Sequence, residues 1–255
     1  MKFFGDYHTH TIFSRRKYIF FNHAKGTIED NILSAKELGL KEIAITDHGF
    51  SHGLFGCSRK NLKSTKEEIT RLSQKHNIKV YFGVEANFIS LDGTIDVLEE
   101  DKKYLDIILC GFHSSAKPKT VKDFFKIFFA NFFAKFFGTS NKLKERNTSL
   151  ILNALEKNKI DVLTHLNRKM KCNVVEIAKK AYEKGVLIEL NEKKCDFTKD
   201  EINGMLNTGV NFIANTDSHD PNKIGKFPKI TKIIENYNIP MDRVVNINNI
   251  PKFKI

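Results

Sequence analysis

The chain has 255 residues, and 41% of them are hydrophobic, which is enough for a packed core and excludes a disordered chain. Its formal net charge of +12 would suit a nucleic acid, a membrane surface or an anionic substrate. The lysines are spread over every segment, so we favour a Lys-rich surface without a dedicated polyanion site. Such a surface would still attract phosphorylated substrates.

Cysteine usage and the amino-terminal residues indicate the compartment. Cys57, Cys110, Cys172 and Cys195 lie far apart and form no CxxC pair, which argues against a zinc knuckle or a disulfide framework. No basic stretch followed by an apolar stretch precedes the first predicted strand, so we expect no secretory signal. We therefore predict a cytoplasmic protein.

Strand-like and helix-like segments alternate along the chain. The first strand is expected at residues 2–8, and the first helix at 27–38, with Thr27 as N-cap, Asp30 three residues later and Gly39 as the stop. Further strands are expected at 42–46, 79–84, 106–111, 161–164, 186–190 and 210–214, and further helices at 64–76, 141–158, 174–184, 199–207 and 229–236. About seven β-then-α units without a flexible linker predict a single α/β domain over residues 1–255, with a closed or nearly closed parallel barrel.

The segment 124–137 breaks this rhythm, because it holds 8 of the 22 phenylalanines. As a helix it would be about 21 Å long, which is short of the ~30 Å that a bilayer core requires. Lys126, Asn131 and Lys135 would form a thin polar side. Three hypotheses stay open: a helix buried against the barrel or in a dimer interface, a lid over the site, or an interfacial membrane helix.

Histidines and acidic residues follow the ends of the predicted strands. His8 and His10 alternate, so their imidazoles point to the same side of the first strand. The later strand ends carry the same residue types, namely His48, Glu85, His113, His165, Asp217 and His219, and the first loop adds His23. In a β/α barrel these ends line one face, where active sites are built. The sequence therefore predicts one polar site at one mouth of the barrel.

Nitrogen and oxygen donors without thiolates fit Zn²⁺, Mn²⁺ or Fe²⁺. The set is too large for one ion, and Glu85 could bridge two, so we expect a cluster of two or three metal ions. Ions about 3.5–4 Å apart polarise phosphoryl oxygens and generate hydroxide near neutral pH. This chemistry predicts hydrolysis, most simply of a phosphate ester.

The same stretches resemble the motifs of the PHP (polymerase and histidinol phosphatase) superfamily, above all its small stand-alone phosphoesterases. They are His8-Thr-His10-Thr11, Thr46-Asp47-His48-Gly49, Gly83-Val84-Glu85-Ala86-Asn87, Gly111-Phe112-His113 and Thr216-Asp217-Ser218-His219. The resemblance extends over nearly the whole chain and implies a distorted (β/α)7 TIM-like barrel with three divalent ions. It also implies that a metal-bridging hydroxide attacks phosphorus, with Glu85, His113 and Asp217 as catalytic residues.

The resemblance assigns a ligand set to each ion. The first ion would take His8, His10, Glu85 and Asp217, the second would share Glu85 and add His113 and His165, and the third would take His23, His48 and His219. The chain departs from the family in its long first loop, in His165-Leu166-Asn167 where relatives often have His-Pro-Gly, and in a Phe-rich helical insertion at about residues 119–140.

Other polar residues have less specific interpretations. Asp47 could act as a general base, but an acid beside a ligand more often orients that ligand. His52 is expected to contact substrate or lie in a plain loop, and His76 to lie at the surface. Candidates for phosphate binding are Arg15, Arg16, Lys117 and Arg168.

The leading hypothesis is a metal-dependent phosphoesterase that hydrolyses a small phosphomonoester. One alternative is a histidinol phosphatase, because that activity is named among the relatives. A nucleic-acid-associated PHP module is less favoured, because no polymerase domain is present. The last alternative is a non-catalytic metal-binding module attached to a membrane or to a partner through residues 124–137.

Overall fold

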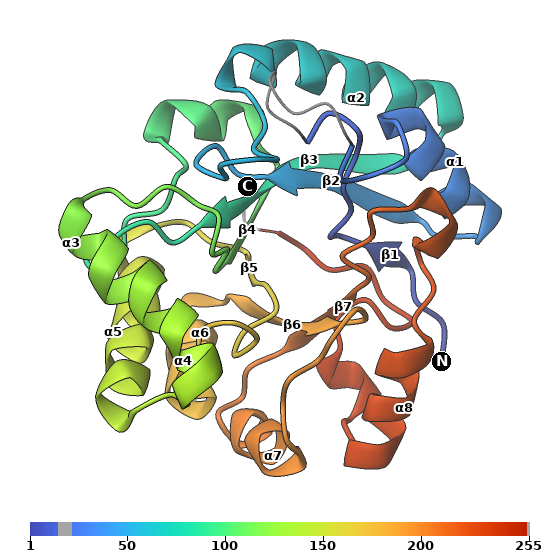
Figure 1. Ribbon diagram of the computed structural model, residues 1–255. Coiled ribbons are helices and arrows are strands. Elements are labelled where there is room, and N and C mark those ends of the chain that lie inside the picture. The colour runs from blue at the N-terminus through green and yellow to red at the C-terminus, as the bar shows by residue number, and fades with distance from the viewer. Residues whose placement is uncertain (15–21, 254–255) are drawn as a thin grey trace.

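The computed structural model describes residues 1–14 and 22–253. Seven parallel strands pair in chain order around a barrel, and helices surround them (Figure 1). The strands are β1 Gly5–Asp6, β2 Glu42–His48, β3 Lys79–Asn87, β4 Ile107–Gly111, β5 Val162–Leu163, β6 Leu187–Asn191 and β7 Phe212–Asn215. The predicted single-domain parallel α/β barrel is confirmed.

Helices connect most successive strands, as the alternating pattern predicts. The outer helices are α1 Ile28–Glu37, α2 Leu62–His76, α5 Asn141–Lys157, α6 Val174–Lys184, α7 Lys199–Asn207 and α8 Pro228–Tyr237. The predicted cap of α1 is present: the Thr27 side chain accepts from the Asp30 amide, and the Asp30 carboxylate accepts from the Thr27 amide. Among the described residues, no helix has both the length and the apolar character needed to cross a membrane.

The first strand is shorter than expected, and side chains complete the barrel beside it. β1 pairs with β2 over two residues instead of the predicted seven, and Thr9 forms an isolated bridge to Ser218 beyond β7. Nearer the other end, the Asn246 amide donates to the carbonyls of Gly5 (2.9 Å) and Ala214 (2.7 Å). Asn246 Oδ1 also accepts from the Ala214 amide at 3.0 Å. A buried side chain thus replaces backbone pairing between β1 and β7.

The barrel interior is apolar below the mouth. Tyr7, Ala44, Tyr81, Ile107, Leu109, Val162 and Ile213 form a buried cluster inside it. The Tyr7 hydroxyl donates to Glu42 at 2.8 Å, so this buried acid has a partner. A larger apolar cluster separates the strands from the outer helices. The polar strand ends are therefore confined to the opposite, carboxyl-terminal end of the barrel.

The Phe-rich insertion forms a continuous helical segment beside α5. It consists of α3 Val121–Asp123, a π-helical stretch Phe124–Phe129 and α4 Ala130–Phe137. The predicted polar side is wrong for Asn131, which is buried and hydrogen-bonded to Asn147 of α5, whereas Lys126 and Lys135 are exposed. The helix is rotated relative to the expected orientation, because the hydrogen-bonded side chains of Asn131 and Asn147 fix the side that faces α5.

The substitution Asn246→Ala should lower the free energy of unfolding by about 2–4 kcal/mol, because it leaves buried backbone groups of Gly5 and Ala214 without partners. Urea denaturation followed by circular dichroism measures the change. Asn203→Ala, on the exposed side of α7, is the matched control and should change stability little. Equal effects of the two substitutions would contradict the role given to Asn246.

Candidate metal centre

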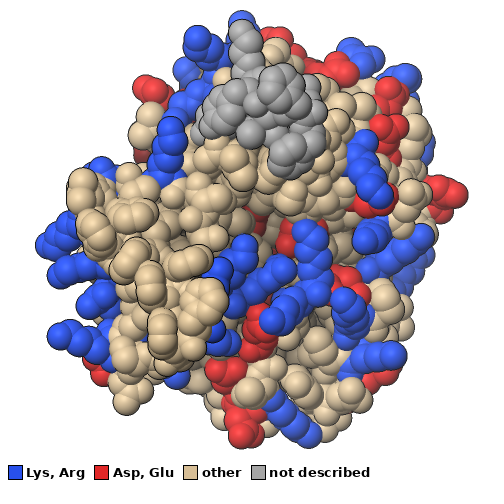
Figure 2. Space-filling model, in the orientation of Figure 1, with Lys and Arg blue, Asp and Glu red and all other residues tan. Residues whose placement is uncertain are grey.

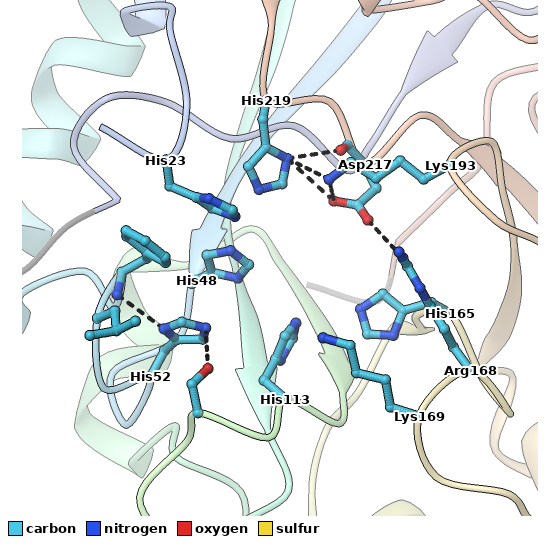
Figure 3. A pocket seen from close by; sticks show the side chains of 13 residues that line it. His23, His48, His52, His113, His165, Arg168, Lys169, Lys193, Asp217 and His219 are labelled. Atoms are coloured by element: carbon cyan, nitrogen blue, oxygen red, sulfur yellow. Dashed lines mark hydrogen bonds and ion pairs between the residues drawn. The ribbon is translucent and has the colours of Figure 1, made fainter. Parts of the chain in front are cut away.

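The nine side chains predicted as ligands lie together at the carboxyl-terminal mouth of the barrel. They are His8 and His10 after β1, His23 before α1, His48 at the end of β2, Glu85 in β3, His113 after β4, His165 after β5, and Asp217 and His219 after β7. Figure 3 shows six of them, namely His23, His48, His113, His165, Asp217 and His219. The structure brings the whole set to one place because parallel strands direct all their carboxyl ends to the same side. Their function as metal ligands stays a prediction.

The Glu85 carboxylate is at the centre of this group and is 1% exposed. Its Oε1 lies 2.7 Å from His165 Nε2 and 3.2 Å from His113 Nε2. Its Oε2 lies 2.8 Å from His48 Nδ1 and 3.6 Å from His10 Nε2. One carboxylate therefore faces imidazoles from four other strand ends, as a bridging ligand would.

Asp217 is the second buried acid of the site. Its Oδ1 lies 3.3 Å from His10 Nε2 and 3.6 Å from His219 Nδ1. Asp217 and His165 both have left-handed backbone conformations, with φ of 52° and 31°. Non-glycine residues adopt such conformations at a cost of about 1–3 kcal/mol, and functional sites are where this strain concentrates.

Three overlapping sets of donor atoms lie within 4.8 Å of one another. They are His8, His10 and Asp217; His10, His48 and His219; and His48, Glu85 and His113. The first set lies within the ligand group expected for one ion, whereas His10 and His48 each join two sets. Among the described residues, His23 and His165 join none of these sets. The His23 ring lies at the edge, 4.2 Å from the His219 ring centroid and stacked on Phe55.

Several donor atoms of the site are buried without a hydrogen-bond partner among the described residues. They are Nε2 of His8 and His219, both ring nitrogens of His10 and His48, and Oε2 of Glu85. His48 Nδ1 and Glu85 Oε2 lie 2.8 Å apart as an ion pair, but outside hydrogen-bonding geometry. A buried polar atom without a partner costs about 1–3 kcal/mol, so a concentration of them needs an explanation. Divalent cations bound by imidazole and carboxylate would satisfy these atoms, and the donor set fits such ions.

The electrostatics of the site favour the metal-binding forms of His10, His48 and Glu85. Burial lowers the pKa of His10 and of His48 well below the ordinary value, which favours neutral imidazole. Burial alone would raise the pKa of Glu85, but the imidazoles of His113 and His8 hold it well below its usual range. His10 and His48 therefore present neutral rings beside an ionised carboxylate. At His8, by contrast, burial is outweighed by the carboxylates of Glu189, Glu85 and Asp217, which raise the pKa of this imidazole well above its ordinary value.

A second layer of polar groups orients these rings. Glu189 on β6 accepts from His8 Nδ1 at 2.7 Å and from the His165 amide at 2.8 Å. Asn87 Oδ1 lies 2.8 Å from His113 Nδ1. Such partners fix the tautomer and direct the other nitrogen toward the metal position. Asp47 accepts from the Thr11 amide and hydroxyl, and its Oδ1 is 4.0 Å from His10 Nδ1.

A cavity of about 280 Å³ opens above the histidines. Its lining includes Arg168, Lys169 and Lys193 (Figure 3), and Lys and Arg side chains gather near the centre of the face shown in Figure 2. Lys193 Nζ lies 3.1 Å from Asp217 Oδ1 and 2.8 Å from His219 Nδ1. The cavity thus has a floor of histidines and Asp217 and a cationic rim, which suits an anionic ligand.

The less specific expectations have different outcomes. Arg168 and His52 line the cavity, Lys117 is not among the lining residues, and Arg15 and Arg16 lie outside the described residues. His76 is only partly buried and pairs with Glu29.

His52 Nδ1 accepts from the Phe55 amide at 3.0 Å, so its Nε2 donates to Ser115 Oγ, 2.7 Å away. His52 therefore orients Ser115 at the cavity wall (Figure 3).

Sequence reasoning missed Glu189, Lys169 and Lys193. Glu189 is the single charged residue in the predicted strand 186–190, and an acid inside an apolar strand signals a buried partner. The two lysines carry no such signal, because a lysine in a loop of this Lys-rich chain resembles any surface lysine.

Comparison with known proteins decides the family. The sequence model of the PHP domain matches residues 6–197. The chain belongs to the PHP domain family. A probable phosphatase of Clostridium novyi is 29% identical over 260 residues, which cover 96% of this chain and 91% of the relative. A probable phosphatase of Acetivibrio thermocellus is 27% identical, with 99% and 94% covered.

A solved structure has the same fold. The histidinol phosphate phosphatase of Lactococcus lactis, whose crystal structure contains zinc, L-histidinol and phosphate, superposes with a TM-score of 0.64. It is 19% identical, with 94% of this chain and 95% of that chain covered. The distorted PHP barrel implied by the sequence motifs is thereby confirmed.

Removing bound metal with a chelator should lower the melting temperature by roughly 5–10 °C, because ions that bind only the folded state stabilise it. Differential scanning fluorimetry with and without added Mn²⁺ or Zn²⁺ measures this shift. Asp217→Asn should reduce the shift. A melting temperature that does not respond to either ion would contradict the metal centre.

Glu189→Gln should weaken metal binding by about 10–100-fold, because His8 loses the carboxylate that fixes its ring. Competition with a chromogenic chelator measures the affinity, and circular dichroism checks the fold. Glu100→Gln, at an exposed position, is the control. Unchanged affinity in Glu189→Gln would remove the orienting role.

Proposed function

We propose that this protein is a metal-dependent phosphoester hydrolase whose substrate is a small phosphomonoester. The observation that carries the proposal is the buried group of unpartnered imidazole and carboxylate atoms beneath a cationic cavity. Relatives that match almost the whole chain are named probable phosphatases, which supports the reaction class. The substrate class is inferred from the volume and the cationic lining of the cavity.

The expected ligand sets distribute the nine residues over three ions. The first would be held by His8, His10, Glu85 and Asp217, the second by Glu85, His113 and His165, and the third by His23, His48 and His219. The clustering of His8, His10 and Asp217 supports the first set. Bound divalent ions would supply an activated water and electrostatic stabilisation of the phosphoryl oxygens.

The chain's own residues contribute orientation and charge. Glu189 and Asn87 hold His8 and His113 in fixed orientations, so the donors need little rearrangement when ions bind. Arg168, Lys169 and Lys193 surround the entrance and attract a phosphate dianion. The volume of about 280 Å³ is at the small end for ligand cavities, which favours a small metabolite over a polymer.

The described lining argues against a histidinol phosphatase. L-histidinol carries a positively charged amino group. The lining has three fixed cations and, apart from Asp217 on the floor, no carboxylate among the described residues. A substrate that bears a second negative or neutral polar group fits this rim better. Histidinol phosphate therefore serves as a test compound, with slow turnover expected.

The deciding experiment is phosphate release from a panel of phosphomonoesters and phosphodiesters, with protein purified without chelators and supplied with Mn²⁺ or Zn²⁺. We expect release from small monoesters that requires metal and falls at least about a hundredfold in His113→Ala. The His113→Ala protein is the background control. Release that survives this substitution, or no release from metal-loaded protein, would contradict the proposal.

Lys169→Ala should raise KM about tenfold with a smaller change in kcat, because a rim cation that attracts substrate contributes mainly to binding. Steady-state kinetics on the best substrate of the panel measures both constants. Lys171→Ala, two residues further on and outside the cavity lining, is the matched control. A KM that is equal in the two variants would exclude Lys169 from substrate binding.

A further inference from the structure

The insertion between β4 and β5 packs through one side only. Ile127 and Phe128 are buried, and the Phe128 ring lies 5.5 Å from that of Phe112, next to β4. Asn131 is 2% exposed and exchanges two amide hydrogen bonds with Asn147 of α5, at 3.0 and 2.9 Å. These contacts fix the rotation of the helix, with a polar residue inside.

The opposite side is apolar and exposed. We call it the phenylalanine surface, and it consists of Phe124, Phe125, Phe129, Phe132, Phe133, Phe136 and Phe137. Phe136 is 69% exposed and Phe137 is 82% exposed. Rings four residues apart contact one another, as Phe129 and Phe133 do at 4.4 Å. In Figure 2 the corresponding region over α3 and α4 is a continuous tan area. This polarity is the reverse of that of an ordinary surface helix.

Basic residues surround the phenylalanine surface. Residues 117–146 contain eight lysines and arginines but only two acids, and one of these, Asp123, is buried. Lys122, Lys126 and Lys135 are exposed on the helix itself. Two copies of the chain that met through this surface would bring like charges together. An apolar surface with a basic border instead complements an anionic interface.

We propose that the phenylalanine surface docks this protein on anionic lipid membranes. The rings enter the boundary between headgroups and acyl chains, and the lysines pair with anionic headgroups. Residues 121–137 form a helical segment of about 25 Å, shorter than the ~30 Å bilayer core, so it lies along the membrane surface.

Docking in this way would also orient the cavity. The tan area and the central Lys and Arg side chains lie on the same face in Figure 2. Lys135 on α4 is near the rim, since burial and then the charges of Arg168 and Lys135 lower the pKa of Lys169. The entrance therefore adjoins the docking surface, and a phosphomonoester at the membrane surface could reach it.

Co-sedimentation with vesicles tests the proposal. The full-length protein is mixed with vesicles of phosphatidylcholine alone or with about one third phosphatidylglycerol. We expect binding to the anionic vesicles, weakening at high salt, and little binding to the neutral ones. Phe136→Ser combined with Phe137→Ser should reduce the partition coefficient about tenfold or more. Lys122→Gln combined with Lys126→Gln should weaken binding to anionic vesicles.

The controls separate docking from general apolar adhesion and from unfolding. Tyr182→Ser combined with Met241→Ser removes exposed apolar groups elsewhere and should bind like the wild type. None of these residues lines the cavity, so hydrolysis of a soluble phosphomonoester should stay unchanged in all variants. Because binding is measured without turnover, failure of the proposed reaction would not affect this result.

Three outcomes would overturn the proposal. The first is a wild-type protein that does not sediment with anionic vesicles, and the second is a Phe136→Ser/Phe137→Ser variant that binds them as tightly as the wild type. The third is a dimer in analytical ultracentrifugation that this variant abolishes, together with no vesicle binding, which would assign the surface to self-association. If the serine pair fails to fold, the lysine pair and the salt dependence carry the test.

Discussion

A buried carboxylate is the constraint on which the rest of the structure depends. Glu85 is ionised, almost inaccessible to water and close to His165, His113 and His48. An ionised group in such a position costs several kcal/mol unless opposite charge and hydrogen bonds compensate. The imidazoles supply part of that compensation, yet Oε2 of Glu85 and several ring nitrogens have no hydrogen-bond partner among the described residues. The arrangement therefore calls for bound cations.

The irregular closure of the barrel serves this site. β1 is short, and beyond it His10 donates its amide to the Ser218 carbonyl at 2.8 Å. That bond joins the segment that carries His8 and His10 to the one that carries Asp217 and His219. Nearer the amino-terminal end of the strands, hydrogen bonds from the Asn246 side chain to Gly5 and Ala214 take the place of backbone pairing between β1 and β7. Glu189 links the mouth once more, from β6 to His8 and to the His165 backbone.

The sequence predicts the strands and their polar ends because both follow from local patterns. Alternating apolar segments mark the barrel, and His, Asp and Glu after each strand converge once the strands are parallel. The groups that sequence reasoning missed depend on tertiary placement. Lys193 reaches Asp217 across a loop, and Asn246 acts on strands more than 30 residues away along the chain. The inward rotation of Asn131 also depends on a partner, Asn147, in another helix.

The Asn131–Asn147 pair explains why the phenylalanines of the insertion stay exposed. A helix that is apolar nearly all round would gain most by burying as many rings as it could, since each buried ring contributes about 1.5–3 kcal/mol. A buried polar pair opposes other rotations, because any that separated the two amides would break both of their mutual hydrogen bonds. The fold thus holds an exposed apolar surface in place. For a chain with a net charge of +12, that surface is compatible with solubility, because like charges keep separate copies apart. The same positive charge attracts the phenylalanine surface to anionic interfaces. The exposed apolar side of the insertion and the charge of the chain therefore both favour docking on such an interface.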